Sequence, residues 1–98
     1  MNTLDRSLIQ TLLAEIEAQL DQGVLPLHSG CLEHLSDADT VLDYLLLMKS
    51  ERMISGNLIT KRDTGAPHRL TNIRLTYVGI KALHQNGNAA YWTAALGN

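Results

Sequence analysis

The feature that most constrains this chain is a run of apolar residues at helical spacing near its N-terminus. These residues recur three and four positions apart: Leu8, Ile9, Leu12, Leu13, Ile16 and Leu20. Such spacing places a single apolar stripe along one face of a helix. Asn2 or Thr3 is expected to cap the start of this helix, and Gly23 is expected to end it. The sequence therefore predicts an amphipathic first helix.

A second apolar stretch predicts a helix from about Asp39 to Arg52. Its apolar positions are Val41, Leu42, Leu45, Leu46, Met48 and Met53. They cover more than half of the helical circumference, which is typical of a helix at the centre of a fold. Ser36 and Asp39 resemble a capping pair at its start. Between the two helices the pattern is weak, with room for one helical turn at residues 31–35.

The residues after the second helix predict a β-hairpin. Ser55, Gly56 and Asn57 break the helical period, and a short strand is expected over residues 58–60. A second strand is expected over residues 69–75, where apolar and polar residues alternate. The segment 61–68 between them contains aspartate, glycine and proline, so it is expected to be the hairpin loop.

Thr76 is expected to cap a further helix that contains Ile80 and Leu83. The expected order is therefore helix, short helical turn, helix, hairpin and helix. An isolated hairpin is marginally stable, so its apolar face should lie on the helices. The 98 residues, with eighteen leucines and no phenylalanine, fit one mainly helical domain. The predicted fold class is α+β, a winged helix over residues 1–98.

Two stretches of the sequence resemble known winged-helix proteins. Residues 45–56 resemble the end of a central helix that leads into the first wing strand. Residues 75–83 resemble the L-T-x-x-G-x-x-x-L element that PadR and MarR regulators also contain. Over residues 4–92 the chain is similar to the small YjcQ-like proteins and to a related phage and bacterial family whose pattern ends in tryptophan, as at Trp92. This resemblance implies a winged helix and suggests DNA, although these families have no established activity; Arg52 stands where they often have glycine.

Charge is distributed unevenly along the chain. The net charge of −2 divides into −7 for residues 1–51 and +5 for residues 52–98. A cationic hairpin can contact phosphates even when the whole protein is acidic. The expected DNA-binding residues of the wing are Lys61, Arg62, His68, Arg69 and Arg74, with Lys49 and Arg52 at the end of the central helix. The expected function is a non-catalytic, wing-led DNA-binding regulator, which the resemblance suggests is of phage origin.

The alternative function is binding to a protein of the phage or its host. Asp37, Asp39 and Asp43 lie at the start of the central helix, where they would repel phosphates in a DNA groove. Together with Glu15 and Glu17 of the first helix, they could instead occupy a basic site on a protein partner.

Other classes of function find little support. His28, Cys31 and His34 have a spacing that suggests zinc, but on a helix they would diverge over about 120°, so no metal site is predicted. No catalytic or cofactor motif is present, and the single cysteine cannot form an intrachain disulfide. The longest apolar run, residues 44–48, is far too short to span a membrane. A cytoplasmic protein without cofactor is expected.

The C-terminal residues 87–98 are expected either to form a dimer contact or to pack back on the first helix. Their candidate contact residues are Tyr91, Trp92 and Leu96. Aromatic side chains beside small alanines suit a close interface. A homodimer is expected by analogy with winged-helix regulators.

Overall fold

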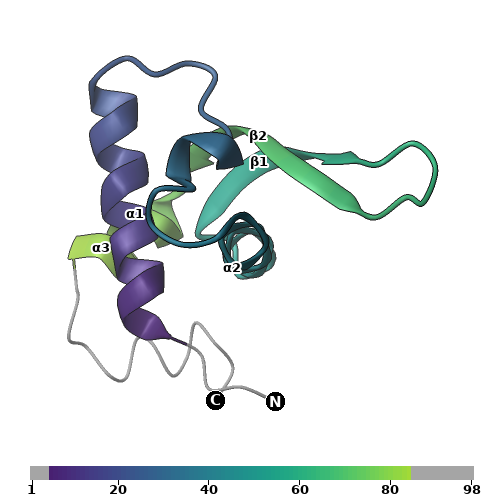
Figure 1. The fold of residues 1–98 in the computed structure, drawn as a ribbon. Coiled ribbons are helices and arrows are strands. Elements are labelled where there is room, and N and C mark those ends of the chain that lie inside the picture. Colours follow the sequence, from purple (N-terminus) through teal and green to yellow (C-terminus); the bar gives the residue numbers. More distant parts are fainter. Residues whose placement is uncertain (1–4, 85–98) are drawn as a thin grey trace.

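The computed structural model describes residues 5–84, and the elements within them follow the expected order (Figure 1). They are α1 (Arg6–Asp21), the 3₁₀-helix η1 (Ser29–Leu32), α2 (Ala38–Ser50), β1 (Ile54–Thr60), β2 (Pro67–Leu75) and α3 (Tyr77–His84). Among these residues the protein is a small α+β fold, about half helical, with three α-helices and one antiparallel hairpin. This confirms the α+β class. No helix in this part of the chain is both long and apolar enough to cross a membrane.

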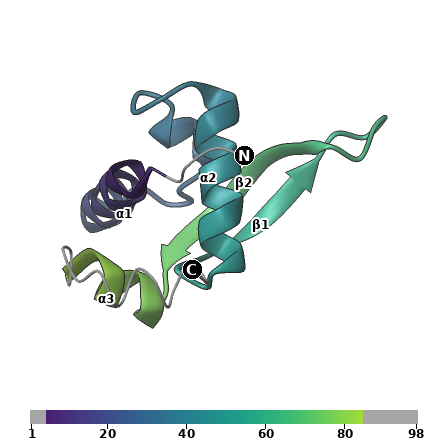
Figure 2. The ribbon, with the colours of Figure 1, turned by 90° about the horizontal axis from the view of Figure 1, so that it is seen from below.

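The core joins the leucine-rich helices to the inner part of the hairpin. The predicted apolar face of α1 and one side of β2 are packed in it, whereas α2 buries only part of its predicted apolar set, because Leu42 and Leu46 stay partly exposed. The fully buried side chains include Ile9, Leu12, Leu13 and Ile16 of α1, Val41, Leu45 and Met48 of α2, and Leu70 and Ile73 of β2. Burying one such side chain contributes about 1.5–3 kcal/mol. The hairpin is therefore held by the helices along its inner half, with α2 lying against it (Figure 2).

Helix α1 begins later than the sequence suggested and ends where it suggested. Asp5 is the N-cap, because its extended backbone lets Oδ1 accept a hydrogen bond from the Leu8 N–H at 3.1 Å. Asn2 and Thr3, the expected caps, lie outside the described residues. At the other end Gly23 has a φ of 85°, and its N–H donates to the Leu20 carbonyl at 3.0 Å. A left-handed glycine at this position closes the helix as expected.

The short helical turn and the start of α2 both differ from expectation by one to three residues. The turn covers Ser29–Leu32 rather than residues 31–35, because the His28 ring accepts a hydrogen bond from the Gly30 N–H and so caps it earlier. The cap of α2 is Asp37, whose carboxylate accepts from the Thr40 N–H at 3.1 Å. The predicted capping pair of residues 36 and 39 was therefore wrong.

Strand β1 begins at Ile54, four residues earlier than expected, and includes the predicted break at residues 55–57. Arg52 has a φ of 65°, which reverses the chain directly after α2. The pairing of Ser55 with Arg74 and of Asn57 with Thr71 leaves one extra residue on β2. This β-bulge, where Asn72 has a φ of 55°, turns both Leu70 and Ile73 toward the core although they are three positions apart.

The segment before η1 covers the outer edge of β2. The Leu27 carbonyl accepts a hydrogen bond from the Ile73 N–H at 2.9 Å. Two residues later, Ser29 Oγ accepts from the Leu70 N–H at 3.3 Å. These bonds satisfy backbone donors of β2 that a two-stranded sheet would leave unpaired. The part of the chain with the weakest sequence pattern thus closes the edge of β2 with one backbone carbonyl and one hydroxyl group.

Helix α3 starts against the turn between α2 and β1. The Thr76 N–H donates to the Met53 carbonyl at 3.1 Å, the Thr76 hydroxyl donates to the Arg52 carbonyl, and the Gly79 N–H donates to Thr76 Oγ1 at 3.1 Å. This confirms Thr76 as the cap. A Cβ on Gly79 would lie 2.0 Å from the Met53 carbonyl oxygen. The glycine is therefore required for the close approach of two backbones.

Replacing Gly79 with alanine should destabilise the protein. In an ordinary helix this change stabilises by about 0.5–1 kcal/mol. Here the added methyl group has no space, and overpacking of this kind costs about 1–3 kcal/mol. Chemical denaturation of Gly79→Ala should show the loss, whereas Ile59→Ala, which truncates an exposed side chain on the projecting hairpin, should change stability little. An unchanged or higher stability of Gly79→Ala would contradict the close contact.

Candidate functional site

The outer half of the hairpin projects away from the helices (Figure 1). Every residue from 57 to 69 is exposed except Ala66, which is half-buried. The connecting loop is ordered by its own backbone: the Lys61 N–H donates to the Ala66 carbonyl, and the Gly65 N–H donates to the Lys61 carbonyl, both at 2.8 Å. Gly65 has a φ of 72°, a conformation that glycine adopts without strain. The loop therefore presents its side chains from a defined position.

Four of the five predicted wing residues gather at the outer end of this hairpin. We refer to them as the tip cluster: Lys61, Arg62, His68 and Arg69. All four are exposed, and no carboxylate within residues 5–84 forms an ion pair with any of them. The one acidic residue in the loop is Asp63. Lys61, Arg62 and Arg69 thus keep their charge for an external anion.

Arg74, the fifth predicted wing residue, is not part of the tip cluster. It pairs with Ser55 at the inner end of the hairpin. Its side chain lines a shallow groove that also contains Glu17 and Asp21 of α1. The predicted DNA-binding set is therefore divided between two regions of the molecule.

Lys49 and Arg52 form a third region, at the C-terminal end of α2. Both side chains are exposed. They lie beside the start of β1, and the seven residues of that strand separate them from the hairpin loop by roughly 23 Å. Arg52 has a left-handed backbone, a conformation that glycine adopts without strain.

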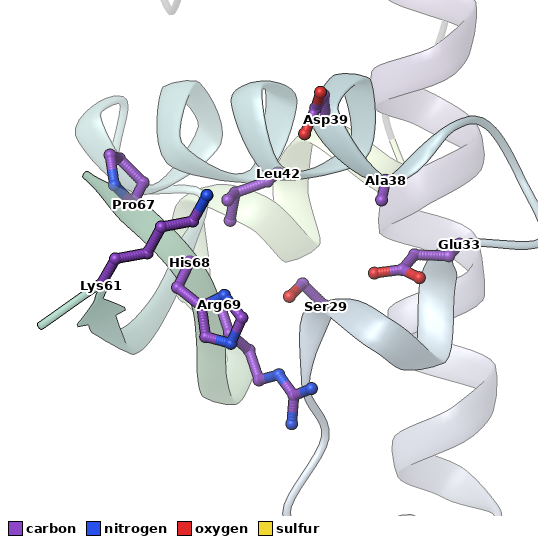
Figure 3. Close-up of a pocket in the computed structure, with 9 residues that line it drawn as sticks. All are labelled: Ser29, Glu33, Ala38, Asp39, Leu42, Lys61, Pro67, His68 and Arg69. Atoms are coloured by element: carbon purple, nitrogen blue, oxygen red, sulfur yellow. The ribbon is translucent and has the colours of Figure 1, made fainter. Parts of the chain in front are cut away.

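A pocket of about 250 Å³ lies between the tip cluster, η1 and the start of α2 (Figure 3). Its lining residues are Ser29, Glu33, Ala38, Asp39, Leu42, Lys61, Pro67, His68 and Arg69. The hairpin supplies the cations and the helical segments supply the carboxylates, so the sign of the surface charge changes across the pocket. Ser29 and Glu33 were not singled out from the sequence, because they belong to the segment without a clear pattern.

The predicted acidic face is also divided by the structure. Asp39 and Asp43 are exposed and lie one turn apart on α2. The Asp37 carboxylate is instead occupied in capping the helix. Hydrogen bonds from the Thr40 hydroxyl at 2.8 Å and from the Thr40 N–H hold the pKa of Asp37 below its ordinary value.

The two glutamates of the predicted face lie on α1 and contact histidines. Glu15 Oε2 is 3.4 Å from His34 Nε2, and Glu17 Oε2 is 3.1 Å from His84 Nε2. They therefore do not join Asp39 and Asp43 in one cluster of free carboxylates.

The three residues with zinc-like spacing have separate roles. The His28 ring caps η1, Cys31 is half-buried against the core, and His34 contacts Glu15. Within residues 5–84 no three histidine, cysteine or acidic side chains are grouped so as to hold a metal ion. The predicted dimer contacts Tyr91, Trp92 and Leu96 lie outside the described residues.

Comparison of the chain with protein-family models, curated proteins and solved structures finds no match. The resemblance to YjcQ-like proteins stays a prediction.

The two N-caps predict a loss of stability in acid. Hydrogen bonds from the Ser7 hydroxyl and the Leu8 N–H lower the pKa of Asp5, as the bonds from Thr40 lower that of Asp37. A carboxyl group with a lowered pKa in the folded state stabilises the fold fully above its ordinary pKa. This contribution is lost as the pH falls through the lowered value.

Thermal unfolding as a function of pH checks this expectation. Asparagine caps a helix as well as aspartate does but does not titrate. Asp37→Asn should therefore flatten the acid side of the stability curve, and the Asp5→Asn, Asp37→Asn double variant should flatten it further. Asp37→Ala should be less stable than Asp37→Asn throughout. A double variant with the wild-type pH slope would rule out these two carboxylates as its source.

Proposed function

We propose that this protein is a non-catalytic winged-helix regulator that binds DNA chiefly through its hairpin. The order of the elements supports a winged helix, as does the backbone hydrogen bond from the Ile73 N–H to the Leu27 carbonyl, which ties the segment between α1 and η1 to the edge of β2. One observation carries the functional proposal: the tip cluster is exposed, unpaired within the described residues and borne by a projecting hairpin. Ammonium and guanidinium groups in that position are suited to DNA phosphates.

The mode of contact follows from the charges on α2. In a typical helix-turn-helix protein the N-terminal part of the second helix reads base edges in the major groove. Here that part of α2 carries Asp39 and Asp43, both exposed. Their carboxylates repel phosphates, so insertion of α2 into the groove is unfavourable. The hairpin therefore supplies most of the binding energy in this proposal, and the number of phosphate contacts is small.

Reversing two charges of the tip cluster should abolish most of the DNA binding. Wild-type affinity for a duplex, measured by fluorescence anisotropy, should fall with salt at a logarithmic slope of about −3, as expected for three to four phosphate contacts. The double variant Arg62→Glu, Arg69→Glu should bind at least about tenfold more weakly, with a shallower slope. Wild-type protein without salt-sensitive binding would refute the proposal.

A matched control separates the tip cluster from a general effect of charge. Arg6→Glu makes the same charge change as Arg62→Glu, but on the exposed first residue of α1. This helix lies on the side of the molecule away from the hairpin tip (Figure 2). Arg62→Glu should weaken binding several times more than Arg6→Glu. Equal effects would mean that the hairpin is not the contact surface.

A second function, docking to a basic protein surface, is favoured by the outward face of α2. Asp39, Leu42, Asp43 and Leu46 follow one another at helical spacing, and the two leucines remain only partly buried. Apolar side chains between carboxylates suit a partner that carries both apolar and basic groups. A DNA-reading helix would present this same face to the groove. DNA reading would require a face that does not repel phosphates, whereas protein docking uses its carboxylates.

Neutralising this face distinguishes the second function from the first. Asp39→Asn, Asp43→Asn should lose a specific partner from an extract of the native cell while retaining DNA affinity. The control Glu51→Gln, Asp63→Asn removes the same charge from positions away from the start of α2 and should retain the partner. If both double variants capture the partner as well as the wild type does, the partner does not dock on α2.

A further inference from the structure

On the side of the molecule away from the hairpin tip, α1 and α3 lie beside each other (Figure 2). Together with the end of β2 they border a shallow groove. Its volume is about 260 Å³. One wall comes from α1 and the other from the end of β2 and from α3. The lining residues are Glu17, Leu20 and Asp21 on the first wall, and Arg74, Leu75 and Ile80 on the second. None of them was expected to form a contact surface of this kind.

The centre of the groove is apolar and continues onto α3. Leu20 and Leu75 are half-buried, whereas Ile80 is 42% exposed. Tyr77, three positions before Ile80 and therefore on the same helix face, is 74% exposed. The Lys81 ammonium lies 5.4 Å from the centre of the Tyr77 ring, an arrangement that a cation–π contact favours. A tyrosine, an isoleucine and an arginine on one surface have the composition of a protein interface.

The negative and positive charges beside this apolar centre lie on opposite walls of the groove. The α1 wall carries the carboxylates of Glu17 and Asp21, and the opposite wall carries Arg74, with Lys81 farther along α3. A two-fold axis that runs along the groove exchanges its two walls, so each wall of one copy faces the opposite wall of the second copy. An axis along the groove would therefore bring the acidic wall of one copy onto the basic wall of the other.

We propose that a second copy of this chain docks on this groove and forms a two-fold dimer. The apolar residues of the two grooves pack against each other, and the carboxylates of one copy face the cations of its partner. An unrelated partner would have to supply both signs of charge in the same order, whereas a second copy does so by symmetry. Because the groove lies away from the tip cluster, both hairpins remain free in the dimer, and the proposal does not depend on DNA binding.

Asp21 and Arg74 are the two charges best suited to a test. Glu17 already contacts His84, whereas Asp21 is exposed and has no ion pair within residues 5–84. Asp21 is also the last residue of α1, where a cation is favourable to the helix dipole, so Asp21→Arg should fold. Arg74→Glu changes an exposed strand position.

Sedimentation velocity over a range of protein concentrations measures the association. Wild-type protein should show a reversible dimer. Arg74→Glu and Asp21→Arg should each raise the dissociation constant about tenfold or more, because like charges then face each other across the axis. An equimolar mixture of the two variants should recover the dimer, since both sets of facing charges are again opposite. Arg62→Glu, which changes charge on the tip cluster, should dimerise like the wild type, and thermal melts should show that all variants fold.

Three outcomes would overturn the proposal. Wild-type protein could remain monomeric over the whole concentration range. The dimer could persist in either charge variant, which would locate the contact elsewhere on the chain. Finally, both variants could be monomeric while their mixture also remains monomeric, which would exclude the facing of the two walls.

Discussion

The arrangement of this protein depends on the contact between the Met53 carbonyl group and the first turn of α3. The Met53 N–H closes the end of α2 by donating to the Met48 carbonyl at 2.9 Å, and the Met53 carbonyl accepts from the Thr76 N–H. Gly79 lets α3 approach this carbonyl at a distance that no side chain permits. One residue thus joins α2, the root of both strands and α3. Because the root is fixed in this way, the hairpin points outward and its polar end stays in water.

The helices could be predicted because local spacing and burial agree in them. Every residue of the α1 stripe is buried or packed against the core, and Thr76 caps α3 as its position indicated. The caps of α1 and α2 were misplaced because several polar residues precede each helix, and the sequence does not show which one has the extended backbone that a cap requires. The start of β1 was missed because Ser55 and Gly56 disfavour a strand locally. Pairing with β2 and burial of Ile54 outweigh that preference.

The candidate site was less predictable than the fold. The sequence places a residue on a strand, but it does not show which surface of the molecule its side chain lines. Arg69 and Arg74 are only five residues apart, yet one lines the pocket beneath the hairpin tip and the other lines the groove beside α1. The bulge at Asn72 shifts the alternation of β2 by one residue and leaves both arginines facing away from the core, so their separation follows from their distance along the strand. A count of positive charges in the second half of the chain therefore overstates the charge available at any one surface.

The separation of these cations gives the molecule two surfaces with different physical character. The tip cluster is exposed and positively charged, so its largest gain in energy comes from an anion, and that gain is screened by salt. The groove between α1 and α3 combines exposed apolar groups with carboxylates on one wall and cations on the other. Most of the energy of association there would come from apolar burial, which is less sensitive to salt. A protein that associates through the groove and binds DNA through the hairpin would respond to ionic strength at one surface and much less at the other. Raising the salt concentration would then release DNA before it dissociates the dimer.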